Sequence, residues 1–160
     1  MASSKTVYEV IKADHNKHRD LLKKVDANDE SSKKYWEKFF YDVKAHAAAE
    51  EETFYSKLMA QTWGQDAARH SVQEHAEMDT LLEELFEMDY NTEDWRKKFK
   101  KLHHDYIHHI DEEEEEIFER AHQVIKENEE KELGSAFLNR KKKELKLVDQ
   151  KREDHMSDSE

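Results

Sequence analysis

The sequence predicts an all-α protein, an up-down-up-down bundle of four helices with a short fifth helix or tail at the C-terminus. Three observations support this. The 160 residues include no proline and only two glycines, Gly64 and Gly134, so the turn residues of a sheet protein are missing. Charged residues make up 41% and hydrophobic residues 36%, as in long amphipathic helices. The 3 Trp, 6 Tyr and 7 Phe recur at helical spacing, which argues for a packed core despite a mean hydropathy of -1.20.

The helices are expected at residues 6–25, 31–61, 66–88 and 92–126. The polar stretch 26–30 ends the first helix, and Ser31 and Ser32 are cap candidates for the second. Gly64 is expected to end the second helix, because glycine commonly stops helices. Asn91 and Thr92 are cap candidates for the fourth. Short links between long helices predict antiparallel neighbours.

The chain after the fourth helix is expected to form a separate, charged segment. Gly134 is predicted to break the chain, which assigns residues 1–135 to the four-helix domain and residues 136–160 to a C-terminal helix and tail. The helix is expected at 136–150, and the last ten residues are expected to be disordered. The run Lys141-Lys142-Lys143 is interpreted as a solvated helix face.

Charge and composition exclude several classes of function. The formal net charge of -12 argues against a nucleic-acid partner, which would need a basic surface. The absence of cysteine excludes disulfides, thiolate metal sites and cysteine nucleophiles. No apolar run approaches the roughly 20 residues that span a membrane. The N-terminus, MASSKTVYEV, has no apolar segment of a secretory signal. A cytoplasmic protein without a membrane partner is the resulting expectation.

Some polar residues fall on the apolar faces of the helices. At about 100° per residue, His109 and Glu113 lie within about 40° of the face that carries Trp95. The same construction turns His104 and His108 toward solvent, together with His70. The inward set takes members from all four helices: His15, His46, Glu50, His75, His109 and Glu113.

These six groups predict a site for cations. Burying them without compensation would cost many kcal/mol, which a bound cation would offset. Nitrogen and oxygen ligands without sulfur suit iron or manganese, and zinc less specifically, whereas calcium and magnesium prefer oxygen. Six ligands exceed the needs of one tetrahedral ion, so we expect two ions that share Glu50 and Glu113, with two histidines for each. The alternative is a polar core network without metal.

The pattern resembles the hemerythrin-like, or HHE cation-binding, domain family over about residues 6–126. That resemblance implies a hemerythrin-like four-helix fold and two non-heme iron ions joined by an oxo or hydroxo bridge. It also implies a small ligand: dioxygen, peroxide or nitric oxide. The matching stretches are Asp14-His15-Asn16-Lys17-His18, His46-Ala47-Ala48-Ala49-Glu50-Glu51, Glu74-His75, and His109-Ile110-Asp111-Glu112-Glu113-Glu114.

The sequence departs from the oxygen-carrying members of that family, which have HxxxH on the third helix and HxxxxD on the fourth. Here Asp79 stands four residues after His75, while Glu113 and Glu114 stand four and five after His109. The departure favours redox chemistry over reversible oxygen carriage. Asp79 is a candidate seventh ligand, and Glu114 is the fallback for Glu113.

Three functions are compatible with the sequence. The first is a di-iron protein that binds or reacts with dioxygen, peroxide or nitric oxide, including peroxide disproportionation; whether it is an enzyme stays open. The second is a module for iron or oxygen sensing or for iron storage. The third is a helical interaction protein without metal. A monomer or weak homo-oligomer is expected. His18, Tyr55 and Tyr106 are interpreted as residues that pack beside the site, with a hydrogen bond from Tyr55 or Tyr106 to a bridging oxygen as the alternative.

Overall fold

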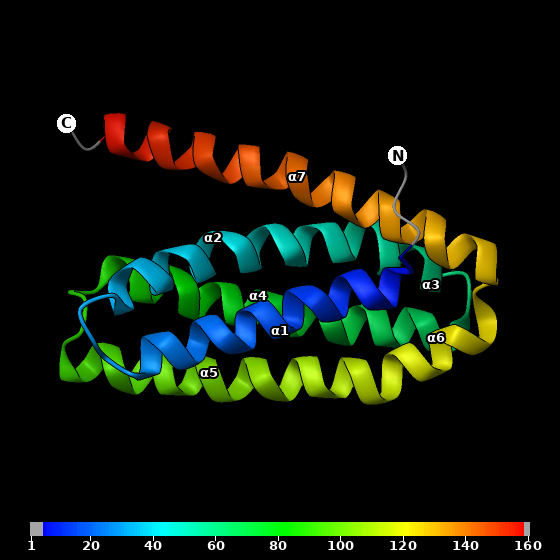
Figure 1. Ribbon diagram of the computed structural model, residues 1–160, viewed down its shortest axis with the longest axis horizontal. Coiled ribbons are helices and arrows are strands. Elements are labelled where there is room, and N and C mark those ends of the chain that lie inside the picture. The colour runs from blue at the N-terminus through cyan, green and yellow to red at the C-terminus, as the bar shows by residue number, and fades with distance from the viewer. Residues whose placement is uncertain (1–4, 159–160) are drawn as a thin grey trace.

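Four long antiparallel helices form the body of the protein, and a fifth long helix lies along α2 (Figure 1). The computed structural model describes the backbone of residues 5–158 and the side chains of residues 5–148. The predicted all-α bundle is confirmed. The long helices are α1 (Val7–Asp26), α2 (Ser32–Glu50), α4 (Thr62–Glu87), α5 (Glu93–Glu112) and α7 (Glu127–Asp158).

Two of these helices continue through a wider turn of π-helix. After α2 the π-turn η1 (Glu51–Tyr55) leads into the single turn α3 (Ser56–Leu58). After α5 the π-turn η2 (Glu113–Ile117) leads into α6 (Phe118–Val124). Such turns admit an extra residue and change which side chains face inward, and they are frequent at functional sites.

Local signals explain where the helices begin. The Thr6 side chain accepts a hydrogen bond from the Glu9 amide, and the Glu9 carboxylate accepts one from the Thr6 amide, which is a complete capping box. Thr92 caps α5 by accepting from the Trp95 amide, while Asn91 before it adopts the left-handed conformation with φ 67°. Ser31 precedes α2 without a side-chain cap.

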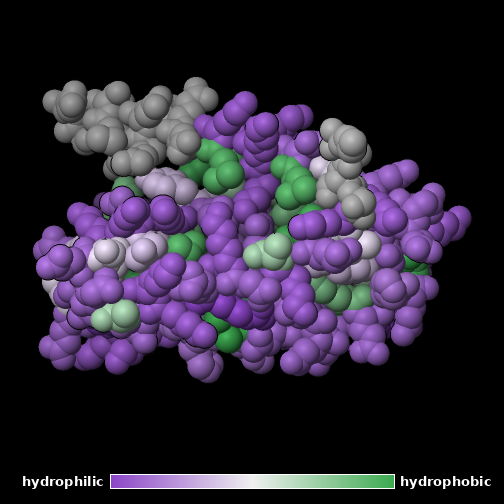
Figure 2. All heavy atoms as spheres, viewed as in Figure 1, coloured by the Kyte–Doolittle hydropathy of each residue, from purple (hydrophilic) through white to green (hydrophobic). Residues whose placement is uncertain are grey.

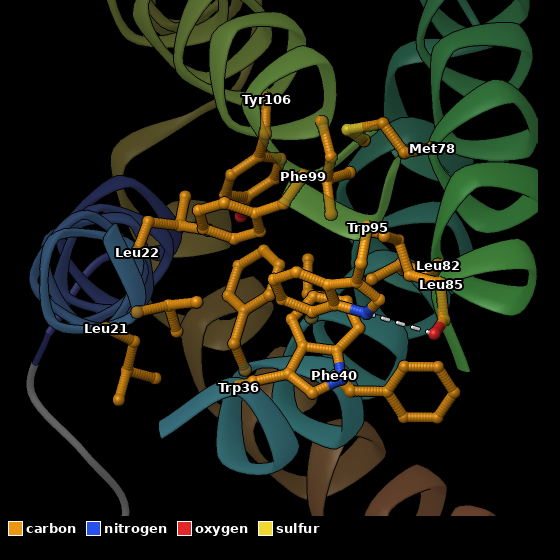
Figure 3. Packing of buried hydrophobic residues seen from close by; sticks show 14 of the residues in the cluster. Leu21, Leu22, Trp36, Phe40, Met78, Leu82, Leu85, Trp95, Phe99 and Tyr106 are labelled. Atoms are coloured by element: carbon orange, nitrogen blue, oxygen red, sulfur yellow. Dashed lines mark hydrogen bonds between the residues drawn. The ribbon is translucent and has the colours of Figure 1, made fainter. Parts of the chain in front are cut away.

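Two apolar clusters fill the interior. One lies toward the α1–α2 and α4–α5 links, where Trp95, Phe99 and Trp36 stack edge-on or face to face (Figure 3). The indole nitrogen of Trp95 is satisfied by the Leu85 carbonyl oxygen at 3.1 Å. The other cluster lies at the opposite end of the bundle and includes Phe54 and Phe118. Between the clusters each of the four helices places polar residues in the interior.

The predicted helix stop at Gly64 is wrong. The break falls at residues 59–61, and Gly64 lies in the first turn of α4. A Cβ atom on Gly64 would stand 1.8 Å from the Leu58 carbonyl oxygen. The glycine therefore permits a close backbone approach at the α3–α4 link rather than ending a helix.

The predicted break at Gly134 is also wrong. The chain breaks at Ile125, which is extended, and α7 then runs from Glu127 to Asp158 without interruption at residue 134. A Cβ on Gly134 would stand 2.5 Å from the Lys5 carbonyl oxygen, so this glycine lets α7 approach the start of α1. The expected disordered tail is helical in its backbone as far as residue 158, and residues 159–160 lie outside the described part. The division of the chain at residue 135 stays a prediction.

Hydrophilic side chains dominate the face shown in Figure 2, with hydrophobic residues in small separate groups. Across the residues that the structure describes, no helix has both the length and the apolar content needed to cross a bilayer.

Candidate metal centre

The six predicted residues meet in the middle of the bundle. His15 stands on α1 between the two apolar clusters, and His75 does so on α4. His46 and Glu50 are one turn apart on α2, as are His109 and Glu113 along α5 and the start of η2. All six side chains are buried, none with more than 7% relative exposure. The angular pattern in the sequence therefore placed every one of them on the correct helix face.

Four of the residues form one group: His15, His46, Glu50 and Glu113. His15 Nε2 is 3.0 Å from Glu113 Oε1, and His46 Nε2 is 3.0 Å from Glu50 Oε2. Ligands about 2.1 Å from a shared ion, at right angles, would be about 3 Å apart. We call these four residues the α1–α2 group.

Glu50 also belongs to a second group, with His75 and His109. His75 Nε2 lies 3.3 Å from Glu50 Oε1 and 3.2 Å from His109 Nε2. Glu113 is more distant, with its Oε2 3.7 Å from His109 Nε2. We call Glu50, His75 and His109 the α4–α5 group. Glu50 is thus common to both groups, whereas Glu113 lies closer to the first.

Each of the four histidines turns Nε2 inward because a carboxylate holds its Nδ1. The Nδ1–oxygen distances are 2.6 Å from His15 to Glu114, 2.8 Å from His46 to Asp14, 2.8 Å from His75 to Glu51 and 2.7 Å from His109 to Glu74. A carboxylate at Nδ1 keeps the proton there and leaves the Nε2 lone pair free, which is the arrangement of metal-binding histidines.

Several of the inward atoms lack hydrogen-bond partners. Among the described residues, the buried side-chain atoms without a partner include His15 Nε2, both carboxylate oxygens of Glu50 and Glu113 Oε1. Buried polar atoms are rarely left unpaired, and two buried carboxylates are costly without positive charge. Imidazole nitrogens and carboxylate oxygens that converge in this way fit a divalent or trivalent transition-metal ion.

Without a cation, protons would take its place. Burial lowers the pKa of His46, but Glu50 and Asp14 outweigh burial and raise it to about 10. Burial also opposes the charge on His75, yet Glu50 and Glu51 raise its pKa to about 9. The same histidines hold the pKa of Glu50 well below its usual value, against the effect of burial. A cation would displace these protons, because only neutral imidazole ligates a metal.

The other predicted candidates are placed as follows. Asp79 is not beside the six residues: its side chain is 55% exposed and pairs with Lys44 at 3.0 Å. Glu114 contacts His15 from outside rather than standing in for Glu113. The Tyr55 hydroxyl donates to Glu113 Oε2 at 2.6 Å. Burial, reinforced by Glu113 and Glu50, raises the pKa of Tyr55, so that it stays a donor.

His18 packs beside the α1–α2 group. Its Nδ1 lies 2.5 Å from the Tyr106 hydroxyl oxygen, and its Nε2 lies 2.6 Å from Asp42 Oδ2. Burial lowers the pKa of His18 to about 4 although Asp42 opposes the change, so the ring is neutral at pH 7. His104 and His108 are exposed, as predicted, and His70 lies at the surface beside Glu74.

Sequence reasoning missed the residues that hold the histidines from outside. Asp14 and Glu74 precede an inward histidine, whereas Glu51 and Glu114 follow an inward glutamate. A neighbour in a helix is turned by about 100°, so it points along the bundle wall toward the adjacent helix. The doublets Asp-His, Glu-Glu and Glu-His were therefore the available signal. Asp42 and Lys141 had no such signal.

A groove of ≈ 680 Å³ runs between α2 and α4 on the outer side of the α4–α5 group, and Glu144 of α7 also borders it. Its wall includes His75 and Glu51, next to the small side chains of Ala47, Ala48 and Ala76. This places His75 at the border between the interior and an open surface.

The hemerythrin HHE cation-binding domain matches residues 6–121. A protein from the cyanobacterium Nostoc sp. (strain PCC 7120), named a DNA nickase, is 26% identical over 114 residues. That alignment covers 70% of this chain and 32% of the relative, so the chain corresponds to about a third of that protein. No solved structure matches the chain. The domain match and the buried histidine–glutamate groups indicate metal binding, and the chain belongs to the hemerythrin HHE cation-binding domain family.

Proposed function

We propose that the protein is a non-heme di-iron protein that binds or reacts with dioxygen, peroxide or nitric oxide. The observation that carries this is the set of buried, unpaired oxygen and nitrogen atoms of Glu50, Glu113 and His15, faced by imidazoles whose Nδ1 atoms are already engaged. One ion would be held by the α1–α2 group and the other by the α4–α5 group, with Glu50 between them.

The chain's own residues prepare the site for small-molecule chemistry. When bound, an iron pair supplies electrons to an oxidant such as dioxygen or peroxide. The outer carboxylates orient the four histidines, and the apolar clusters on either side keep bulk water away. The Tyr55 hydroxyl oxygen lies 2.6 Å from Glu113 Oε2 and donates to it, which keeps a proton beside the α1–α2 group.

The first experiment is metal content by mass spectrometry on protein purified without chelators, with an absorption spectrum of the same sample. We expect about two irons per chain and near-ultraviolet bands of a bridged iron pair. Protein that takes up no metal even after anaerobic loading with ferrous iron would make the interior a polar network and end the proposal. Peroxide added to the iron-loaded protein tests the reaction: oxygen release supports disproportionation, and its absence removes that activity.

Iron or oxygen sensing, or iron storage, is the second candidate. The groove beside His75 favours it, because an open surface next to a metal ligand can transmit a change at the metal to a partner. A sensor should change its fold or its partner binding when the iron is reduced or removed, and a purely catalytic protein should not. A cytoplasmic location and a monomeric or weakly associated state belong to both candidates and stay predictions.

The name of the cyanobacterial relative raises DNA as a further substrate to test. The net charge of -12 disfavours binding to the phosphate backbone. Iron-loaded protein is incubated with supercoiled plasmid, with and without a radical scavenger. Nicking that persists with the scavenger would be cleavage by the protein itself, whereas nicking that the scavenger stops would come from radicals generated by iron. We expect no scavenger-resistant nicking.

A further inference from the structure

The fifth helix contributes a lysine to the surroundings of the metal centre. Lys141 was interpreted as part of a solvated run with Lys142 and Lys143, but its side chain is 11% exposed whereas both neighbours are exposed. Its Nζ donates to Asp14 Oδ1 at 2.9 Å and to Asp42 Oδ2 at 3.0 Å. A lysine is almost never this buried unless it is paired.

One face of α7 explains how this lysine reaches the interior. Gly134, Phe137 and Lys141 follow one another at three and four residues, which places them on the same side of the helix. Gly134 permits contact with the backbone of Lys5, as described above. Phe137 is fully buried, and its ring centroid is 5.4 Å from that of His46. In Figure 1 this half of α7 lies against the bundle near the N-terminus.

Both carboxylates that Lys141 holds are themselves partners of buried histidines. Asp14 accepts from His46 Nδ1 at 2.8 Å, and Asp42 is bonded to His18 Nε2 at 2.6 Å. The lysine thus sits at the junction of two carboxylate–histidine pairs, one of which includes a residue of the α1–α2 group. The only other lysine that the structure brings to Asp42, within the described residues, is Lys17, whose side chain is 53% exposed.

The ammonium group of Lys141 compensates the negative charge of two buried carboxylates. Asp14 and Asp42 have side chains that are 14% and 8% exposed, so each needs a cationic or hydrogen-bonding partner. Without Lys141, the Asp14 carboxylate would have to find another partner or turn toward water. Its hydrogen bond to His46 Nδ1 would weaken, and the orientation of the His46 ring, and so the position of Nε2, would be less well defined.

We propose that Lys141 is a positioning residue for the α1–α2 group, so that α7, which lies outside the matched region 6–121, is part of the cation site. The inference rests on the proposed function in that a cation must bind there. The α4–α5 group supplies an internal contrast, because among the described residues its histidines are held by Glu51 and Glu74, and no hydrogen bond or ion pair joins either histidine to α7.

The test measures cation affinity in two variants of the protein, each of which keeps only one of the two groups intact. With His75→Ala the α1–α2 group remains, and with His46→Ala the α4–α5 group remains. Cobalt(II) is titrated into metal-free protein and followed by its visible absorption, with Lys141→Met compared to the matched control Lys142→Met. We expect Lys141→Met to weaken cobalt binding about tenfold or more in the His75→Ala background and to leave it unchanged in the His46→Ala background. Lys142→Met should change neither.

Equal affinities for Lys141→Met and Lys142→Met in the His75→Ala background would overturn the inference, even if Lys141→Met lowers the melting temperature of the metal-free protein. That result would make Lys141 a purely structural residue. If Lys141→Met does not fold, Lys141→Gln keeps a hydrogen-bond donor without the charge and is read in the same way. Failure of the wild type to bind any cation would instead remove the proposed function, and this inference with it.

Discussion

The α1–α2 group and the α4–α5 group arise from the same sequence pattern but lie in different surroundings. His15 with His46–Glu50 corresponds to His75 with His109–Glu113, and each histidine has a carboxylate at Nδ1. On the first side the outer carboxylates Asp14 and Glu114 are 14% and 15% exposed. On the second side Glu51 is 36% exposed and borders the groove.

The difference shows that the two sides, which share one sequence pattern, are covered differently. α7 packs on α1 and α2 and brings Lys141 and Phe137 to the first group. Two further pairs of corresponding positions differ between the sides: His18 corresponds to Met78, three residues after an inward histidine, and Tyr55 corresponds to Phe118, five residues after an inward glutamate. We expect a tighter site under α7 and a more accessible site beside the groove.

Loss of the Glu50 carboxylate should abolish metal binding on both sides, which is the largest effect that we expect. It is fully buried and belongs to both groups. Glu50→Gln keeps the shape but replaces the shared carboxylate with a neutral amide that has a single oxygen, so we expect metal content to fall from about two ions per chain to nearly none. Elemental mass spectrometry after anaerobic loading measures this. The exposed Glu115→Gln is the control and should retain both ions; two ions in Glu50→Gln would show that Glu50 holds neither.

Single histidine variants should remove one side at a time. His46→Ala takes a ligand from the α1–α2 group only, and His75→Ala takes one from the α4–α5 group only. We expect about one ion per chain in each variant. In the presence of metal, each variant should have a lower melting temperature than the wild type, because metal binding to the folded state adds to its stability. His104→Ala, on an 83% exposed side chain, should behave as wild type. Full metal content in both inner variants would contradict the assignment.

Acid should destabilise the metal-free protein through the α1–α2 side. The pKa of His18 is lowered by burial from 6.5 to about 4 in the folded chain. As pH falls through this range the unfolded chain binds a proton that the folded chain does not. The contribution of His18 to the free energy of unfolding is therefore complete above pH 6.5 and is lost toward pH 4, by about 3 kcal/mol. Urea unfolding of metal-free protein at several pH values measures the slope.

The matched variant for this prediction is His18→Met, which gives α1 the residue that α4 carries at the corresponding position. It should be less stable at pH 7, because Asp42 and Tyr106 lose a partner, but nearly free of the decline between pH 6.5 and 4.5. An unchanged slope would assign the acid sensitivity to another group.

The outer carboxylates should differ between the two sides in proportion to their burial. Glu114→Gln removes the anion at His15 Nδ1 from a site that Arg19 also contacts at 3.0 Å, and we expect about a tenfold to hundredfold loss of cation affinity. Glu51→Gln should cost less, because water in the groove can accept from His75 Nδ1 in its place. Cobalt titration of both variants measures the difference; equal losses would mean that burial does not set the strength of the outer support.

Tyr55→Phe should have the smallest effect. At the corresponding position on the other side, the chain has Phe118, which has no hydroxyl group. Removing the bond to Glu113 Oε2 should cost about 1 kcal/mol of unfolding free energy and leave the metal content unchanged. The half-buried Tyr35→Phe is the control. A loss of metal in Tyr55→Phe would show instead that the hydroxyl keeps Glu113 in place.

Much of the candidate site was predictable because helical periodicity is a local property. Angles of about 100° per residue put the six inward residues on the apolar faces whatever the neighbouring helices are. The outer carboxylates were within reach of the same argument, since each adjoins an inward residue. The glycines were misinterpreted because their role lies in contacts with Leu58 and Lys5, which composition does not reveal.

By itself, the sequence determined the all-α bundle, the inward histidines and glutamates, and a ligand set of nitrogen and oxygen suited to a cation. Only the tertiary structure decided that Glu50 but not Glu113 is common to both groups, that Asp79 faces Lys44 at the surface, and that Lys141 is buried between Asp14 and Asp42. The physical reason is that a residue's face follows from the geometry of its own helix, whereas its partners and its exposure depend on which helix covers that face.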